Sequence, residues 1–249
     1  MVSSEQRRRQ LARDKYERQM QARAEAAAKR KKRNAVVAAV VAVLVVAGVA
    51  TAASGALDSD KKEDKAASAA PSPSASGKQW ATEPAMSIDT AAQYTATMDT
   101  SAGKVTFSLD AAKAPHTVNS FVFLAGQQFW DGTKCHRLTT EGIYVLQCGD
   151  PTGTGSGGPG YSFADENLTG ATYPAGTVAM ANSGANTNGS QFFLVYKDTQ
   201  LPPNYTPFGK ITGGLDVLQK IADAGVQGGG GDGAPATAVN VTAITAVKG

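Results

Sequence analysis

Residues 180–193, MANSGANTNGSQFF, carry most of the information about the fold of this 249-residue chain. The middle of the stretch consists of small and polar residues, and its end consists of two adjacent phenylalanines. Small polar residues with glycine are typical of loops, whereas aromatic residues are enriched in strands. The stretch therefore predicts a polar loop that runs directly into an aromatic strand.

Two further segments extend this interpretation. Residues 135–150 (CHRLTTEGIYVLQCGD) predict a hairpin that places Arg137 and Gln147 on paired strands, and residues 201–210 (LPPNYTPFGK) add apolar side chains beside a turn. Together the segments offer apolar candidates for a shallow pocket with Arg137 at its rim: Tyr144, Val145, Phe193, Leu201 and Tyr205. Composition alone favours core strands with a surface arginine over such a pocket.

Residues 88–249 have the patterns of a globular domain. Alternating apolar and polar residues at 94–98 and 105–109, joined by a turn, predict a β-hairpin. Residues 114–125, with Pro115 in the first turn, predict a helix, and residues 215–224 predict a second one. Further short strands are predicted at 134–138, 143–147, 177–180, 191–196, 207–211 and 239–247. This pattern favours a closed or nearly closed antiparallel β-barrel whose ends are covered by the helices.

Motifs for nucleophilic, metal or nucleotide chemistry are missing or incomplete. The sequence has no GxSxG, HExxH or CxxC, and its two cysteines and two histidines are too few for a multi-ligand zinc site. Residues 153–158, GTGSGG, match GxGxxG, but Pro159 and more loop residues follow where a helix would be needed. We therefore expect no metal and no cofactor, and a mobile Gly-rich loop in place of a dinucleotide site.

Taken together, these segments resemble the cyclophilin family of peptidyl-prolyl cis–trans isomerases. The resemblance covers residues 90–247 in order, and the run MANSGANTNGSQFF is its most specific part. It points in particular to the membrane-anchored extracytoplasmic cyclophilins of actinobacteria. The resemblance implies a mainly β fold, a closed eight-stranded antiparallel β-barrel capped by two α-helices, and an enzyme that isomerises X–Pro bonds in exported or cell-envelope proteins.

The same resemblance assigns a site. The catalytic arginine of the family falls on Arg137, and the family's proline-pocket and peptide-cleft positions fall on Tyr144, Val145, Gln147, Ala181, Asn182, Gln191, Phe193, Leu201 and Tyr205. Several positions depart from the commonest family pattern. Tyr144 and Val145 replace a Phe-Met pair, and two extra residues lengthen the turn before them. Tyr205 stands where a histidine is usual, and Gln200 stands where many eukaryotic members carry a tryptophan, which argues against tight cyclosporin binding.

These residue types suit the reaction. Amide resonance gives an X–Pro bond a barrier of about 20 kcal/mol, and rotation makes or breaks no bond, so no nucleophile, metal or cofactor is required. In the twisted amide the prolyl nitrogen regains a lone pair, to which the permanently charged guanidinium of Arg137 can donate a hydrogen bond. The alternative function is a catalytically weak module or chaperone that binds proline-containing segments in the same groove.

Cys135 and Cys148 lie at roughly mirror positions on the two arms of the predicted hairpin. In an oxidising compartment they can form a disulfide that locks the strands carrying Arg137 and Gln147. Two reduced, buried thiols fit the sequence equally well, and the sequence leaves both alternatives open.

The N-terminal third has the composition of a membrane anchor followed by a tether. Residues 34–57 have no charged side chain and are long enough to cross a bilayer core of about 30 Å, and basic residues fill positions 29–33 just before them. The positive-inside rule then predicts a cytoplasmic tail at 1–33 and an extracytoplasmic domain at 88–249. A cleaved secretory signal is the alternative, but the long basic leader disfavours it. Residues 58–87, rich in Ala, Ser, Pro and Lys, predict a flexible linker.

The distribution of charge bears on possible partners. Residues 1–33 contain 12 Lys+Arg and 4 Asp+Glu, whereas the rest of the chain contains 12 and 17. The pI near 8.8 therefore describes the tail, and the acidic remainder lacks the basic footprint of a nucleic-acid-binding domain. We expect proline-containing polypeptides as partners, membrane contact through residues 34–57, no nucleic acid, and a monomer.

Overall fold

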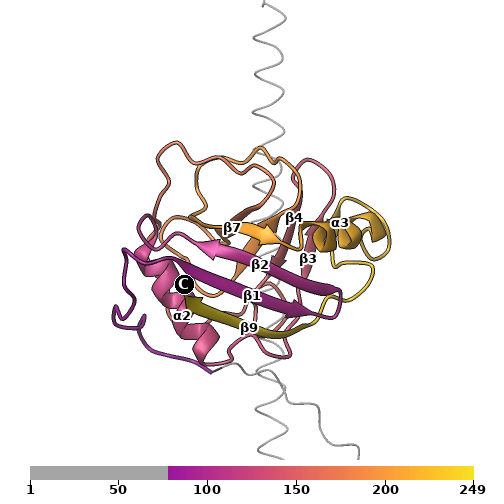
Figure 1. Cartoon of the computed structure of the whole chain (residues 1–249). Coiled ribbons are helices and arrows are strands. Elements are labelled where there is room, and N and C mark those ends of the chain that lie inside the picture. The colour runs from indigo at the N-terminus through magenta and orange to yellow at the C-terminus, as the bar shows by residue number, and fades with distance from the viewer. Residues whose placement is uncertain (1–77) are drawn as a thin grey trace, which may run out of the picture. The chain divides into compact units, whose positions relative to one another are not determined.

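The structure is a computed structural model, and it describes residues 78–249 (Figure 1). The predicted tail at 1–33, the predicted membrane span at 34–57 and most of the predicted linker at 58–87 lie outside the described residues. In the part of the chain from residue 78 onward, no helix combines the length and the hydropathy that a bilayer crossing requires.

The described residues form a mainly β domain around a single sheet of nine strands in the order β8-β3-β4-β6-β5-β7-β2-β1-β9. Every pair of neighbouring strands is antiparallel. The strands are β1 (Tyr94–Thr100), β2 (Gly103–Leu109), β3 (Arg137–Thr139), β4 (Val145–Cys148), β5 (Thr177–Met180), β6 (Phe192–Val195), β7 (Pro207–Gly213), β8 (Asp232–Gly233) and β9 (Val241–Lys248).

A closed barrel of eight strands is not confirmed. The sheet has nine strands, and β8 and β9 at its two ends are not paired with each other within residues 78–249. The segment before β3 instead reaches β9 through short backbone hydrogen bonds: Gly132 N donates to Val241 O, Val241 N to Thr133 O and Cys135 N to Val239 O. A few backbone hydrogen bonds between β9 and the segment before β3 thus take the place of the continuous strand pair that would close the barrel.

Two helices pack against the sheet (Figure 1). Helix α2 (Pro115–Gly126) contacts β9, and helix α3 (Leu215–Ala224) contacts β2. The free N–H groups at the start of α2 are satisfied by a distant side chain, because His116 N and Thr117 N donate to the Glu166 carboxylate over 3.1 and 2.9 Å. A carboxylate at this position also suits the positive end of the helix dipole.

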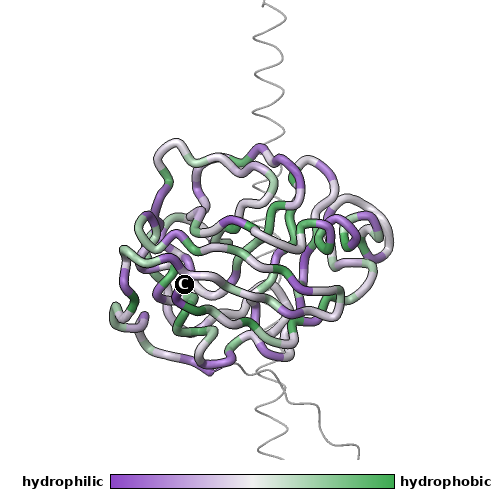
Figure 2. The backbone as a smooth tube through the Cα atoms, in the orientation of Figure 1, coloured by the Kyte–Doolittle hydropathy of each residue, from purple (hydrophilic) through white to green (hydrophobic). Residues whose placement is uncertain are grey.

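The main core is aromatic. The Phe121 ring of α2 lies within 4.6–5.7 Å, centroid to centroid, of the rings of Phe107, Trp130, Phe192 and Phe208. All five side chains are at most 3% exposed. Burial of such large rings supplies most of the stabilisation that an apolar core can give. Figure 2 shows hydrophobic segments along the strands and α2, whereas many connecting loops are hydrophilic.

A second, smaller cluster lies on the other face of the same strands. Along β6, Phe192 and Leu194 face the main core, while Phe193 and Val195 belong to the second cluster. Successive side chains of a strand point to opposite faces, so both faces of β6 are buried and the strand has no polar residue. This alternation explains why the sequence ends its polar loop in an unbroken apolar run.

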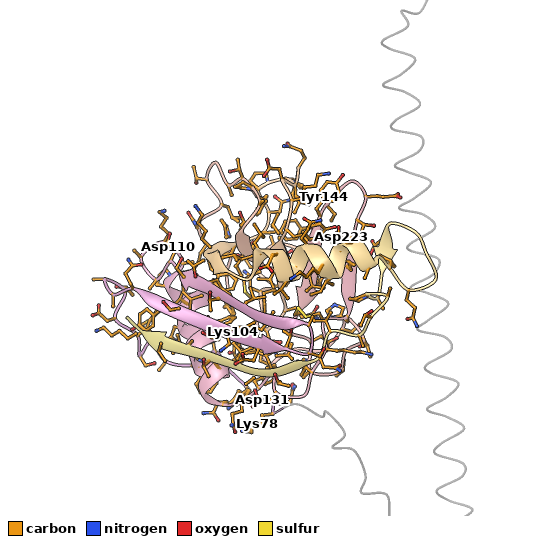
Figure 3. The ribbon with its side chains drawn as sticks, turned by 45° about the vertical axis from the view of Figure 1, so that its right-hand side comes forward. Lys78, Lys104, Asp110, Asp131, Tyr144 and Asp223 are labelled. Carbon is orange, nitrogen blue, oxygen red and sulfur yellow. A yellow bond between two sulfur atoms is a disulfide. The ribbon has the colours of Figure 1, made fainter. Side chains whose placement is uncertain are left out.

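Residues 78–87, which the sequence assigned to the end of the linker, make contacts with the domain. Trp80 N donates to Pro159 O over 2.9 Å, and the Trp80 ring packs edge-on against Phe123 with ring centroids 5.1 Å apart. Lys78, labelled in Figure 3, donates through Nζ to Gln127 O. Residues 78–87 therefore pack against the domain, because one partly buried indole and several backbone hydrogen bonds outweigh the polar composition around them.

Candidate active site

A groove of about 480 Å³ collects most of the residues that the resemblance assigned to a site. Its lining includes eight of them, drawn from strands β3, β4 and β6 and from the loops after β5 and β6: Arg137, Val145, Gln147, Ala181, Asn182, Phe193, Leu201 and Tyr205. Residues 137 and 205 are far apart in the chain, so the sheet brings them together. The groove has an apolar floor and one strongly charged edge.

The floor of the groove is the second apolar cluster. Phe193 is 4% exposed and packs edge-on against the Tyr205 ring, with centroids 5.6 Å apart. Beneath them, the buried Tyr173 holds the Tyr205 loop at two points: its hydroxyl donates to Tyr205 O over 2.8 Å and accepts from Tyr205 N over 3.1 Å. A floor held in this way is rigid, and it offers a ligand two aromatic ring faces, those of Phe193 and Tyr205.

The charged edge is the guanidinium of Arg137. Its Nε and Nη2 donate to the two carboxylate oxygens of Asp232, each over 2.7 Å, and its Nη1 donates to Gln147 Oε1 over 3.4 Å. The hydrogen bond to Asp232 raises the pKa of Arg137, and the same bond lowers the pKa of Asp232. Both groups are therefore charged at neutral pH.

A chain of side-chain amides continues from the arginine. Gln147 Nε2 donates to Gln191 Oε1 over 2.9 Å, and Gln191 Nε2 donates to Gly157 O over 2.8 Å. Gln191 does not line the first groove but a second cavity of about 830 Å³. The two cavities share Gln147, Gly155, Ala181 and Asn182 as wall residues, so they form one extended cleft.

Tyr144 is the one assigned residue that lines neither of these two cavities. Its ring packs edge-on against Tyr196, with centroids 6.1 Å apart, and Lys197 Nζ lies 4.4 Å from the ring centroid. Figure 3 shows Tyr144 on the side of the domain where Asp223 of α3 lies. Ile143 lines the groove instead. Val145 and Gln147 of β4 face the groove, and Ile143, two residues before Val145, continues this alternation ahead of the strand. This period-2 pattern was the signal available in the sequence.

The Gly-rich loop at 153–158 is neither a phosphate cradle nor a free loop. The carboxylate of Asp150, which is fully buried, accepts hydrogen bonds from the backbone N–H groups of Thr152, Thr154 and Ser156 over 2.7–3.0 Å. Burial raises the pKa of Asp150, but hydrogen bonds from the backbone and side chain of Thr152 and from the backbone of Gly157 and Gly155 outweigh it and hold the pKa below its usual value. The Asp150 carboxylate thus occupies the loop N–H groups that a phosphate would otherwise need. It also fixes the loop, which forms one wall of the cleft.

His136 and Asp232 also line the groove and were not among the assigned residues. Burial lowers the pKa of His136, and its Nδ1 is buried without a hydrogen-bond partner in the described domain. A neutral imidazole therefore stands beside the arginine. Asp232 follows four glycines, and this composition signals a loop without indicating what the loop contacts.

Cys135 and Cys148 form a disulfide, which decides between the two alternatives left open by the sequence. The bridge joins the segment before β3 to the end of β4, next to the cross-strand pair Arg137 and Gln147. Both cysteines are at most 2% exposed. The bridge therefore fastens the two strands that carry the charged edge of the groove.

Reduction of this disulfide should lower the free energy of unfolding by about 3 kcal/mol, the value expected for a loop of roughly 15 residues. The measurement is chemical denaturation with and without reductant, together with intact mass, which should rise by two hydrogen atoms on reduction. A Cys135→Ala, Cys148→Ala double variant is the control and should not respond to reductant. An unchanged denaturation midpoint of the reduced wild-type chain would contradict the prediction.

Comparison with known proteins identifies the family. The sequence pattern described as "Cyclophilin type peptidyl-prolyl cis-trans isomerase/CLD" matches residues 95–246. A "Probable peptidyl-prolyl cis-trans isomerase B" of Mycobacterium tuberculosis is 53% identical over 167 residues, which cover 61% of this chain and 54% of that protein. "Peptidyl-prolyl cis-trans isomerase B" of Streptomyces anulatus is 41% identical over 152 residues, covering 54% of this chain and 84% of that protein.

A solved structure agrees with this result. The cyclophilin type peptidyl-prolyl cis-trans isomerase of Cryptosporidium parvum, crystallised in the presence of the dipeptide Ala-Pro, has a TM-score of 0.55 and 30% identity, and the match covers 61% of this chain and 97% of that one. The matched region spans about half the length of the mycobacterial relatives. The pattern match alone extends over more than half of this chain, so the chain belongs to the cyclophilin-type peptidyl-prolyl cis-trans isomerase family.

Proposed function

We propose that the chain accelerates cis–trans isomerisation of X–Pro bonds in polypeptides, with Arg137 as the catalytic residue. The observation that carries the proposal is the position of the Arg137 guanidinium at the edge of a groove whose floor is Phe193. Family membership and the names of the relatives support the activity. The dipeptide used with the Cryptosporidium protein supports a proline-containing ligand.

The groove can perform this reaction by binding the twisted amide better than either planar form. A pyrrolidine ring on the apolar floor of Phe193 and Tyr205 would be held still while the residue before it rotates. As the amide twists, the prolyl nitrogen regains its lone pair. Arg137 Nη1, which makes only a long bond of 3.4 Å to Gln147, is the donor available to it. Such a donor helps only the twisted state and therefore lowers the barrier.

The rest of the cleft would position the peptide. Asn182 is itself held by a bond of 2.8 Å from its Nδ2 to Asn204 O, and Gln147 is held by Gln191. Side chains whose rotamers are fixed in advance lose less entropy when a ligand binds. The second cavity, lined by Gln191 and the loop fixed by Asp150, would receive residues of the same peptide beyond the proline.

The direct test is an isomerisation assay with the full chain in detergent, in which the cis–trans relaxation of a proline peptide is followed by NMR exchange spectroscopy. We expect exchange that is enhanced in proportion to enzyme concentration. A chain that binds the peptide without accelerating exchange would instead be the alternative considered above, a module or chaperone that holds proline-containing segments in the same groove. The second outcome would overturn the catalytic proposal.

We also propose that the domain acts outside the cytoplasm, anchored by residues 34–57, on exported or cell-envelope proteins. The sequence pattern of residues 29–57 supports an anchor with a cytoplasmic N-terminus. The Cys135–Cys148 disulfide supports an oxidising compartment, because cytosolic thiols are usually kept reduced. Cell fractionation with an N-terminal epitope tests the anchor, and the epitope should stay with the membrane fraction. The monomeric state expected from the sequence stays a prediction.

A further inference from the structure

We propose that Asp232 is a positioning residue that holds the Arg137 guanidinium in its working orientation. The inference rests on the proposed function and deepens it, because it names the group through which the arginine is kept in place. Asp232 lines the groove but would act through Arg137 and not on the substrate.

The geometry of the pair supports this role. Asp232 accepts from both Nε and Nη2 of Arg137 over 2.7 Å each, which is the bidentate arrangement that fixes the plane of a guanidinium. A free arginine side chain has many rotamers, so an unheld guanidinium would sample many orientations. With Nε and Nη2 occupied, Nη1 is the nitrogen left for the groove.

The backbone places Asp232 opposite the arginine strand. Asp232 belongs to β8, which pairs with β3 in the register Thr139↔Asp232 and Leu138↔Gly233. Arg137 lies two residues from Thr139 on the same face, so Arg137 and Asp232 are diagonal neighbours across the two strands. Long side chains at diagonal positions reach each other. The ion pair is therefore a consequence of strand pairing and not of a chance meeting of two surface residues.

The loop around β8 is built to keep this register. Gln227 N donates to Ala234 O and Ala236 N to Gly225 O, each over 2.8 Å, so the two arms of the loop are joined to each other. The glycines beside Asp232 permit close packing. A Cβ at Gly231 would lie 2.7 Å from the side chain of Glu141, and a Cβ at Gly233 would lie 2.8 Å from that of Val226.

The pair is too exposed to be explained as a stabilising contact. The side chains of Arg137 and Asp232 are 38% and 56% exposed. Ion pairs as exposed as this one contribute little to stability. Loss of the carboxylate should therefore change the orientation of Arg137 while the fold stays intact, so an effect on activity and an effect on stability can be measured separately.

The test is Asp232→Asn in the full chain. We expect kcat to fall about tenfold with KM changed less than about twofold, since a misplaced catalytic group impairs the chemical step more than ground-state binding. The thermal unfolding midpoint should stay within about 2 °C of the wild type, as for loss of a weak surface pair. The matched control is Asp216→Asn, which removes the same charge from an exposed pair with Lys220 on α3 and should leave kcat unchanged.

Two further measurements separate positioning from a direct or structural role. In an Arg137→Ala background, Asp232→Asn should cause no additional loss of activity, because an effect that passes only through Arg137 vanishes with it. The Arg137 Nε–H resonance in nitrogen-15 NMR should be sharp in the wild type and broadened in Asp232→Asn.

A wild-type value of kcat for Asp232→Asn, or an equal loss of activity in the Arg137→Ala background, would overturn the inference. An inactive wild-type chain would overturn the proposed function instead. In that case the NMR resonance of Arg137 still decides whether Asp232 holds the guanidinium.

Discussion

Arg137→Ala is expected to lower kcat/KM for a proline peptide at least tenfold, and by about 100-fold if Arg137 contributes as much as one donor of an oxyanion hole. The physical reason is that the guanidinium contacts the prolyl nitrogen only while the amide is twisted. Removal of this donor leaves the planar forms bound as before and raises the barrier. The fall should therefore appear in kcat more than in KM.

The same variant should unfold at nearly the wild-type temperature. Arg137 is partly exposed, and its partner Asp232 becomes solvated when the guanidinium is removed. Arg137→Lys is the matched variant, because it keeps the charge and loses the planar fork. It should remain impaired, since an ammonium cannot bind the Asp232 carboxylate in a bidentate manner and also present a donor to the groove. A normal isomerisation rate in Arg137→Ala would remove this residue from the mechanism.

Phe193→Ala is expected to lower the free energy of unfolding by about 3–5 kcal/mol, the usual cost of removing a buried phenylalanine. Phe193 is 4% exposed and packs against the rings of Tyr173 and Tyr205. The same ring forms the floor of the groove, so the affinity for proline peptides should fall as well. Chemical denaturation and the KM of the isomerisation reaction measure the two effects.

A pair of smaller changes separates binding from folding if Phe193→Ala fails to fold. Phe192 and Phe193 are adjacent in β6 but face the main core and the groove cluster respectively. Phe192→Leu and Phe193→Leu should each destabilise the domain by about 1 kcal/mol, a typical cost of a similar-sized apolar exchange. We expect only Phe193→Leu to raise KM. An equal rise in both variants would argue that the floor of the groove lies elsewhere.

Local patterns predicted the elements well. The helix expected at 215–224 is α3 (Leu215–Ala224), and the helix expected at 114–125 is α2 (Pro115–Gly126). The hairpin expected at 94–98 and 105–109 is formed by β1 and β2, each longer by two residues. These elements were predictable because apolar spacing and turn residues act over a few neighbouring positions. Closure of the sheet was not predictable in the same way, because it depends on contacts between its two distant ends.

In the site, too, some features were predictable from the sequence and others depended on the tertiary structure. The resemblance placed Arg137 and Phe193, and the groove contains both. It also placed Tyr144, whose side chain lies outside the groove. The turn before it is two residues longer than in the family pattern, and Ile143 takes the position that faces the cavity. A motif specifies which residue types are present, whereas an insertion beside it changes which of them face the cavity.

The amino-acid sequence alone indicated the cyclophilin resemblance, which the family match confirms. It also predicted the two helices, the hairpins and most of the groove residues. All of these are carried by residues close together in the chain or by a motif of specific residues. Only the tertiary structure decided that Arg137 pairs with Asp232, 95 residues away, that Tyr173 supports Tyr205, and that Trp80 packs against the domain. Such long-range contacts depend on where each loop lies in the folded domain. The composition of a loop indicates that the chain turns there, but it does not indicate which distant residues the loop contacts.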